Sequence, residues 1–494
     1  MKYLLLLGLL LFLSCSDHNE PPYVPPYSYY VAPLKQSDTS LTISLTIRDK
    51  SSDSITILLP PIYADNPLLE ERLPTVTNIS ITESYGDTAT FIEKSISFDQ
   101  FQTRAITFDR QDSLYTLTYE VSFNYKDTTI LTPSISPQGG YLQGNYLFAL
   151  PYKGEELVQL WRGHNHFEVS YKLPQTMTLF GDPTKGWQGY NFYQLLFSTS
   201  LLNGTIMTSG SIERQYYSFV SPLATPFPHI TEAKEAFEGI MYTILASFKP
   251  ATPAPITVIF DSNKSGGLEG TFAFSIQSSL YETSPSLFNM VLAHEALHWW
   301  IGVYTGDYDD PWWKEGTTDY LGFLVSTRAG FTNYQDMANE MLRDYSSDPI
   351  IASMALSDPS LRYILYNDLG NLTYYRLVYG KGGQFSMILD AEIRKHTQGK
   401  MKLEDVLNTL FENHWHSAFT RNEYLKAISS TTGYDAEKLF TRYVDQSGSI
   451  SQEILDEALA TISHYEHFAT TSQQSAQIRS LQQPWFIEYY STTH

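Results

Sequence analysis

The sequence is poor in cysteine and in positive charge. Only one of its 494 residues, Cys15, is a cysteine, so intramolecular disulfides, four-thiolate metal sites and CxxC redox motifs are excluded. The chain has 32 Lys and Arg but 53 Asp and Glu, which gives a net charge of −21 at pH 7. We expect no nucleic-acid partner, because this acidity would repel nucleic acids, and anionic lipid surfaces as well, over a Debye length.

Apolar and aromatic residues are nevertheless abundant. Hydrophobic residues make up 42% of the chain and aromatic residues 14%, which argues against a disordered protein in spite of its negative charge. A chain of 494 residues also exceeds one ordinary domain. The sequence therefore predicts a large globular protein of two or three domains, held together without disulfides.

The N-terminus has the pattern of an export signal. The apolar run at 4–13 is too short to span a bilayer and is followed by Ser14 and Cys15. This pattern resembles a bacterial lipoprotein signal, which implies that residues 1–14 are removed and that a lipid on Cys15 anchors the protein in the cell envelope. We expect the outer membrane, on its periplasmic or its exposed side. Residues 15–26, with four prolines, would form a stiff tether. The alternative is a plain signal peptide whose cysteine is incidental.

Residues 27–220 have the pattern of β-strands. Apolar residues at 41, 43, 45 and 47 alternate with polar ones, and residues 117–125 repeat this alternation. A period of two indicates half-buried antiparallel strands, and the turn residues between such runs favour a sandwich-like domain. His164 and His166 could be metal ligands, but a surface loop is the better interpretation.

From residue 221 the pattern becomes mainly helical. An apolar strand at 256–260 is followed by the loop Gly-Gly-Leu-Glu-Gly at 266–270 and by a second, alternating strand. The pair Ser-Pro at 284–285 then predicts a helix start, with serine as the N-cap and proline in the first helical position.

That helix carries the metal-binding motif HExxH. Its i,i+4 spacing places His294 and His298 on one helical face, where two neutral imidazoles can bind one Zn²⁺, and Glu295 lies beside them to accept a proton from water. After sixteen intervening residues, Glu315 begins a second predicted helix and would be the third ligand. Three protein ligands leave one position open, as a catalytic zinc site requires. Asp319, one turn further on, could hold the second N–H of a ligand histidine. The alternative is a surface helix with charged residues.

These residues resemble the glycyl aminopeptidase family, a relative of the aminopeptidase N family within the gluzincins. The resemblance lies in HEALHWW, WWKEGTTDYLGFLVSTRAG, the GGLEG loop and VYGKG at 378–382. Together with the patterns above, it implies an α+β protein without a PDZ domain. Its expected parts are an N-terminal antiparallel β-sandwich-like domain at 27–220, a thermolysin-like zinc metallopeptidase domain at 221–395, a C-terminal helical part at 396–468 and a tail at 469–494.

The resemblance also implies site residues. One zinc ion would be bound by His294, His298 and Glu315. Glu295 would be the general base that later protonates the leaving amine. Glu269 stands where relatives hold the α-amino group of the substrate.

Two further features of the resemblance concern the substrate. Gly266 and Gly267 would contact it, although the Gly-Gly-Leu-Glu turn could instead be a simple hairpin. Tyr379 stands where relatives place the phenol that hydrogen-bonds the tetrahedral oxyanion, and Tyr374 or Tyr375 could take this place.

The expected activity is hydrolysis of N-terminal residues from peptide substrates. Gly270 stands where glycyl aminopeptidases usually have histidine, so the preferred residue, glycine or another small one, stays open. The alternatives are a zinc endopeptidase and a non-catalytic surface lipoprotein that captures peptides.

Overall fold

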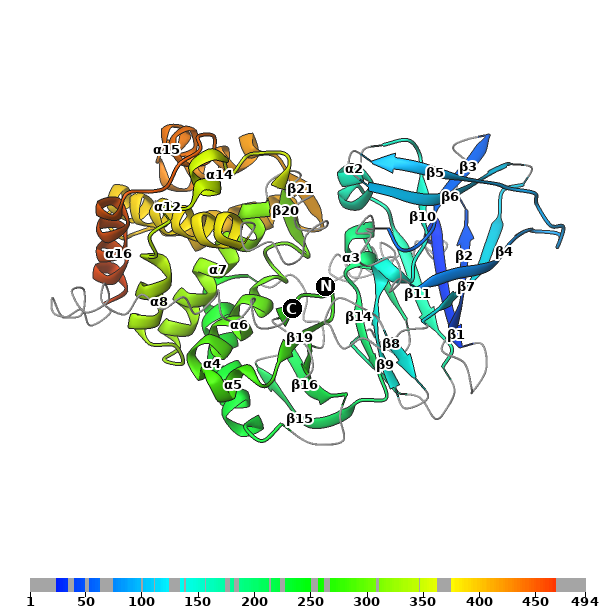
Figure 1. Cartoon of the computed structure of the whole chain (residues 1–494), viewed down its shortest axis with the longest axis horizontal. Helices are drawn as coiled ribbons and strands as arrows, with labels where there is room; N and C mark the ends of the chain where they lie inside the picture. Colours follow the sequence, from blue (N-terminus) through cyan, green and yellow to red (C-terminus); the bar gives the residue numbers. More distant parts are fainter. Residues whose placement is uncertain are drawn as a thin grey trace, which may run out of the picture.

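The computed structural model places a β-rich part beside a mainly helical part. In Figure 1 the strands of the first half of the chain (blue to cyan) lie on one side and the helices of the second half (green to red) on the other. The predicted features Cys15, Gly266, Tyr374 and the tail at 469–494, together with the signal peptide, lie outside the described residues. The structure describes residues 24–467 apart from 34–39, 49–52, 63–73, 99–100, 111, 124–133, 137–138, 156, 174–177, 182–185, 213–214, 223–226, 250–255, 262–266, 308–310, 346 and 362–374.

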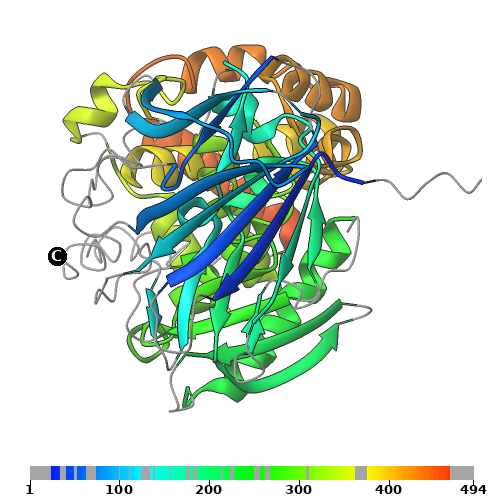
Figure 2. The ribbon, with the colours of Figure 1, turned by 90° about the vertical axis from the view of Figure 1, so that its right-hand side faces the viewer.

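The described strands of the β-rich part form three sheets. The largest has the order β13-β11-β1-β2-β7-β4, and the others have the orders β10-β3-β6-β5 and β12-β14-β9-β8. In Figure 2 these strands face the viewer, with the helices behind them. The strands are β1 Tyr27–Pro33, β2 Ser40–Ile47, β3 Ser54–Leu58, β4 Thr75–Glu83, β5 Ile92–Phe98, β6 Phe101–Asp109, β7 Tyr115–Ser122, β8 Ser134–Ser136, β9 Gly139–Gln143, β10 Leu150–Tyr152, β11 Phe167–Tyr171, β12 Leu179–Phe180, β13 Trp187–Gly189 and β14 Thr199–Leu202.

The predicted alternation is confirmed in the two central strands. In β2 every second residue is buried, and β7 shows the same pattern. The expected antiparallel pairing does not hold for β1, which pairs parallel with β11. A period of two reports that one face of a strand is buried, but it carries no information about the direction of the neighbouring strand.

A mixed sheet connects this part to the helices. Its order is β15-β16-β17-β19-β18, and β15 and β16 begin before the predicted boundary at residue 221. The predicted apolar strand, β17, is buried along its whole length, while β18 lies at the edge. The strands are β15 Thr205–Ile212, β16 Gln215–Ser221, β17 Ile256–Asp261, β18 Gly267–Leu268 and β19 Ala273–Gln277.

Helices pack around the mixed sheet and share one hydrophobic core with it, while a separate core fills the β-rich part. Among the described residues, no helix combines the length and the apolar character needed to cross a membrane. Two short helices, α2 Leu157–Arg162 and α3 Phe192–Leu196, belong to the β-rich part and its core. The helices of the second half are α4 Ile230–Ser247, α5 Leu280–Thr283, α6 Pro285–Leu297, α7 Pro311–Arg328, α8 Tyr334–Met341, α9 Pro349–Ser353, the π-helix η3 Tyr375–Lys381, α12 Gly382–Thr397, α13 Leu403–His414, α14 Arg421–Thr432, α15 Glu437–Tyr443 and α16 Gln452–Glu466. The short strands β20 Thr305–Asp307 and β21 Ser417–Phe419 pair beside them.

Polar contacts tie α7 to three later helices. Tyr320 donates a hydrogen bond of 2.6 Å to Asp390 of α12. At the end of α7, Arg328 donates to Glu404 of α13 at 2.7 Å and to Glu466 of α16 at 2.6 Å. Because removing one partner of such a buried network is costly, these contacts hold α7, and the residues it carries, in a fixed position.

Candidate metal centre and active site

The helix α6 begins where the sequence predicts. The side chain of Ser284 accepts a hydrogen bond from the backbone N–H of Leu287, and Pro285 occupies the first helical position. The helix then runs to Leu297, with His298 as its C-cap. It is buried along most of its length against the mixed sheet and α7, so both histidines face the protein interior.

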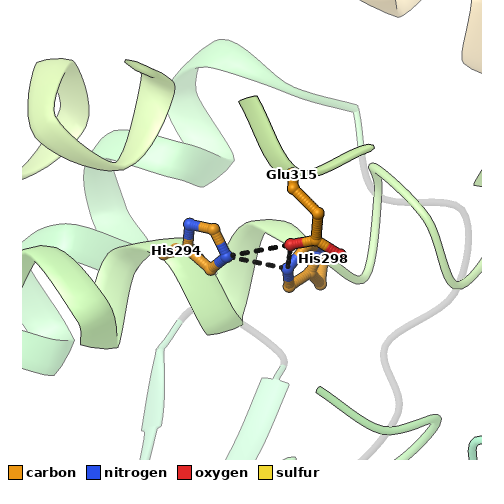
Figure 3. Close-up of side chains that lie close together, drawn as sticks. All are labelled: His294, His298 and Glu315. Carbon is orange, nitrogen blue, oxygen red and sulfur yellow. Dashed lines mark hydrogen bonds and ion pairs between the residues drawn. The ribbon is translucent and has the colours of Figure 1, made fainter. Parts of the chain in front are cut away.

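His294, His298 and Glu315 converge on one point (Figure 3). The Nε2 atoms of the two histidines lie 2.9 Å apart. Oε2 of Glu315 lies 3.5 Å from Nε2 of His294 and 3.4 Å from Nε2 of His298. All three side chains, which together are called the metal group, are buried. Two imidazole nitrogens and one carboxylate oxygen within 4.8 Å of one another form a donor set that fits Zn²⁺.

The second nitrogen of each histidine faces an oxygen atom. Nδ1 of His298 lies 3.0 Å from the carbonyl oxygen of Ile301, which can only accept, so this nitrogen carries the proton and leaves Nε2 free for a metal. Nδ1 of His294 lies 3.3 Å from Oδ1 of Asp319, the residue that the sequence suggests for this contact. Both rings therefore present Nε2 to the same point.

The electrostatics of this cluster favour a positive charge. Burial would lower the pKa of His294, but the carboxylates of Asp319 and Glu315 raise it to about 10. Burial would raise the pKa of Glu315, but Lys314 and His298 hold it well below its usual range. A metal ion would supply the cation that these groups stabilise, so the residues present fit zinc.

Glu295 lies beside the metal group and next to β18. Burial raises the pKa of its carboxyl well above the usual range, against the opposing effect of His294. A side chain on Gly267 would collide with this carboxylate, so the backbone can approach Glu295 only because residue 267 is glycine. Oε2 of Glu295 has no hydrogen-bond partner among the described residues, which leaves it available to a water molecule or a substrate.

Glu269 follows β18 and is buried beside the metal group. Its carboxylate, that of Glu295 and a ring nitrogen of His298 lie within 4.8 Å of one another. Burial would raise the pKa of Glu269, but the ammonium group of Lys314 lowers it. Lys314 forms an ion pair with Glu269 and lies 3.1 Å from Oε1 of Glu315. Lys314 is not among the site residues predicted from the sequence, and the signal that points to it is a cation directly before a predicted metal ligand.

The β-rich part supports the loop that carries Glu269. The hydroxyl of Thr271 donates a hydrogen bond of 2.6 Å to the carbonyl of Gln194, and its N–H donates to the carbonyl of Phe197. Trp299, just after the HExxH motif, donates to the carbonyl of Gly270 at 3.1 Å. The loop is thus held from α3 on one side and from the end of α6 on the other.

Tyr379 reaches the metal group from the π-helix η3. Its ring lies 5.9 Å from that of His294, nearly parallel to it, and Tyr375 packs against Tyr379 at 5.2 Å. Tyr379 is half-buried. Close packing of Gly316 against Gly382 lets α7 and α12 approach backbone to backbone, and this brings the chain around Tyr379 toward Glu315.

His164 and His166 are not part of the site. Both lie between α2 and β11, and neither belongs to the metal-binding groups found among the described residues. The ring of His166 contacts that of Tyr190 instead, at 5.4 Å.

Comparisons with known proteins agree with this geometry. Residues 261–443 match the family model described as peptidase family M1 domain. No curated protein matches the sequence. Among solved structures, the chain is similar to an aminopeptidase N family protein from Idiomarina loihiensis, with a TM-score of 0.64 and 15% identity over 87% of this chain and 78% of that one.

Two further solved structures share the fold. An M1 zinc metallopeptidase from Deinococcus radiodurans has a TM-score of 0.56 and 12% identity over 86% of this chain and 94% of that one. Native yeast LTA4 hydrolase has a TM-score of 0.56 and 13% identity over 89% of this chain and 72% of that one. The expected relation to the aminopeptidase N family and the α+β fold are confirmed. Residues 261–443 thus match the peptidase family M1 domain, and the protein is a zinc metallopeptidase in which His294, His298 and Glu315 can hold zinc.

Proposed function

We propose that the protein is an aminopeptidase that removes N-terminal residues from peptides. The observation that supports this proposal best is the buried carboxylate of Glu269 beside His298 and Glu295. The metal group already has its carboxylate in Glu315, so Glu269 is not needed as a metal ligand and its carboxylate can serve the substrate. A substrate whose scissile bond lies next to its own α-ammonium group would place that ammonium near Glu269, and only a chain terminus offers such a group.

His294, His298 and Glu315 would hold the metal. When bound there, zinc supplies a Lewis acid that polarises a carbonyl and lowers the pKa of water. Glu295 then accepts a proton from the attacking water and gives it to the leaving amine. Its burial and its unpaired Oε2 atom support this role, because a carboxyl group with a raised pKa can both take and return a proton.

Two further groups would act on the substrate. Tyr379 would donate a hydrogen bond to the oxygen on which negative charge develops, an effect worth about 3 kcal/mol in comparable sites. Gly267 lies in the edge strand β18, whose outer backbone groups could pair with an extended peptide.

The decisive experiment compares free and blocked substrates. Aminoacyl-coumarin amides and their N-acetyl counterparts are assayed with the native protein and with Glu295→Gln, each with and without a zinc chelator. We expect the native protein to prefer the free amines, and the variant to keep its zinc and its fold while losing nearly all turnover. Equal cleavage of blocked peptides would favour an endopeptidase. Absence of stoichiometric zinc in the native protein, with no turnover, would favour a non-catalytic protein that captures peptides.

We also propose that the protein is anchored in the cell envelope through a lipid on Cys15. Support for this proposal comes from the N-terminal sequence alone, because Cys15 lies outside the described residues. The full chain has a net charge of −21, and the tether at 15–26 would keep its acidic body away from an anionic membrane.

A further inference from the structure

Lys314 occupies a position that the proposed chemistry leaves unexplained. It is the residue directly before Glu315, and only 17% of its side chain is exposed. Its ammonium group pairs with Glu269, the carboxylate assigned above to the substrate's α-ammonium, and lies 3.1 Å from Oε1 of Glu315. The ammonium group of Lys314 thus already pairs with the carboxylate that is proposed to bind the α-ammonium group of the substrate.

The surroundings of Lys314 hold its ammonium group in this place. Its ammonium nitrogen lies 5.9 Å from the centre of the Tyr193 ring and 5.1 Å from that of Phe197, two residues of the β-rich part. These distances allow cation–π attraction. A side chain on Gly302 would collide with the methylene groups of Lys314, so the stem of the lysine packs closely against the backbone there. Contacts from both parts of the molecule therefore position the pair with Glu269.

We propose that Lys314 is a specificity-determining residue that competes with the substrate's α-ammonium for Glu269. The inference rests on the proposed function of Glu269. Two ammonium groups at one carboxylate repel each other strongly in a buried site. A substrate with a free amino terminus must therefore share or displace the contact of Lys314, whereas a neutral N-acyl terminus brings no second cation. Lys314 thus reduces the difference in affinity between substrates with a free amino terminus and N-acylated substrates, and it lets the enzyme accept the N-acylated ones.

A merely structural role for Lys314 is the rival explanation. Its contact with Glu315 could serve only to orient a metal ligand. In that case its removal would change zinc binding and the overall rate, but it would affect free and blocked substrates equally. The quantity to measure is therefore the ratio of the affinity for a free-amine ligand to the affinity for its N-acylated counterpart.

The experiment measures binding without turnover. Zinc-loaded Glu295→Gln protein is titrated calorimetrically with L-leucinamide and with N-acetyl-L-leucinamide, alone and with Lys314→Met added. We expect Lys314→Met to tighten binding of the free amine about tenfold or more and to change binding of the acetylated ligand less than about twofold. Lys314→Arg, which keeps the charge, should keep the original ratio. Lys249→Met removes an exposed lysine that pairs with Glu412, and it is the matched control that should change neither ligand.

Each result decides the proposal. The proposal is overturned if Lys314→Met leaves unchanged, or lowers, the ratio of the affinity for L-leucinamide to that for N-acetyl-L-leucinamide. No detectable binding of either ligand to Lys314→Met also overturns it. The same holds if Lys314→Arg changes this affinity ratio as much as Lys314→Met does. If Lys314→Met does not fold, Lys314→Asn replaces it; if neither neutral variant retains zinc, Lys314 belongs to the metal centre and the proposal is overturned. Failure of the proposed function would appear separately, in the native protein, as no hydrolysis of aminoacyl amides or as equal hydrolysis of free and N-acetylated ones.

Discussion

Loss of the partly buried cation Arg328 should destabilise the protein in a way that depends on pH. Arg328 pairs with Glu404, which is fully buried, and with Glu466. Burial would raise the pKa of Glu404, but Arg328, Lys402 and Arg394 lower it to about 2. The native protein therefore stabilises the ionised form of a carboxyl group whose pKa in the unfolded chain is about 4.3.

The magnitude follows from this difference in pKa. A shift of roughly 2 units corresponds to about 3 kcal/mol of stability. Because the folded pKa is the lower one, this contribution is complete above about pH 4.3 and is lost as the pH falls toward about 2. Asp390 in the same network has a raised pKa, so its contribution to the pH dependence of stability has the opposite sign. The difference in the free energy of unfolding between native protein and variant at each pH is therefore more informative than the pH profile of either protein alone.

In Arg328→Met the carboxylate of Glu404 keeps, among the described residues, its contacts with Lys402 and Arg394. Breaking one partner of a buried pair costs about 3–5 kcal/mol, and this cost should be largest at neutral pH, where Glu404 must ionise. It should shrink toward pH 4, where protonation relieves the unpaired charge, and Arg328→Met combined with Glu404→Gln should recover part of the loss.

Urea denaturation of zinc-free protein between pH 4 and pH 8 measures this effect without a contribution from metal release. Lys249→Met, which breaks an exposed ion pair, is the control and should cost less than about 1 kcal/mol. A cost for Arg328→Met that is below about 1 kcal/mol, or that grows as the pH falls, would refute the reasoning.

Three further predictions concern the site and the anchor. Tyr379→Phe should lower kcat about 100-fold with little change in KM, while Tyr375→Phe should leave kcat nearly unchanged; steady-state kinetics of both variants tests the assignment, and equal losses would contradict it. Glu269→Ala should raise KM for free-amine substrates more than for N-acetylated ones, and an equal rise for both would count against the α-amino anchor. Cys15→Ser should move the protein from the membrane fraction to the soluble fraction on cell fractionation, and an unchanged distribution would argue against lipid attachment.

Local patterns were sufficient to predict several elements of the structure. The serine–proline pair predicts the start of α6, and the N-cap contact of Ser284 confirms it. The alternating residues of β2 are buried as expected. Both patterns depend on neighbours in the chain, so no tertiary information is needed to recognise them.

Pairing between distant segments was not predictable in the same way. The parallel contact of β1 with β11 joins segments more than 130 residues apart, and the mixed sheet takes strands from both sides of residue 221. Such pairings are selected by the packing of whole layers, and an alternating pattern is equally compatible with several partners.

The residue pattern alone specifies the chemistry of the metal centre. The spacing of His294 and His298 on one helix, with Glu315 on the next, specifies the donor types and the open position, because helical geometry places residues four apart on one face. The charges that surround that centre depend on how distant segments pack in the folded protein. This packing brings Glu269 from a loop and Lys314 from α7 into one buried ion pair, because the β-rich part and the helices close around both residues. A charge pair across two elements leaves no periodic signal in the chain, so the group that we propose to set the substrate preference became visible only in the folded protein.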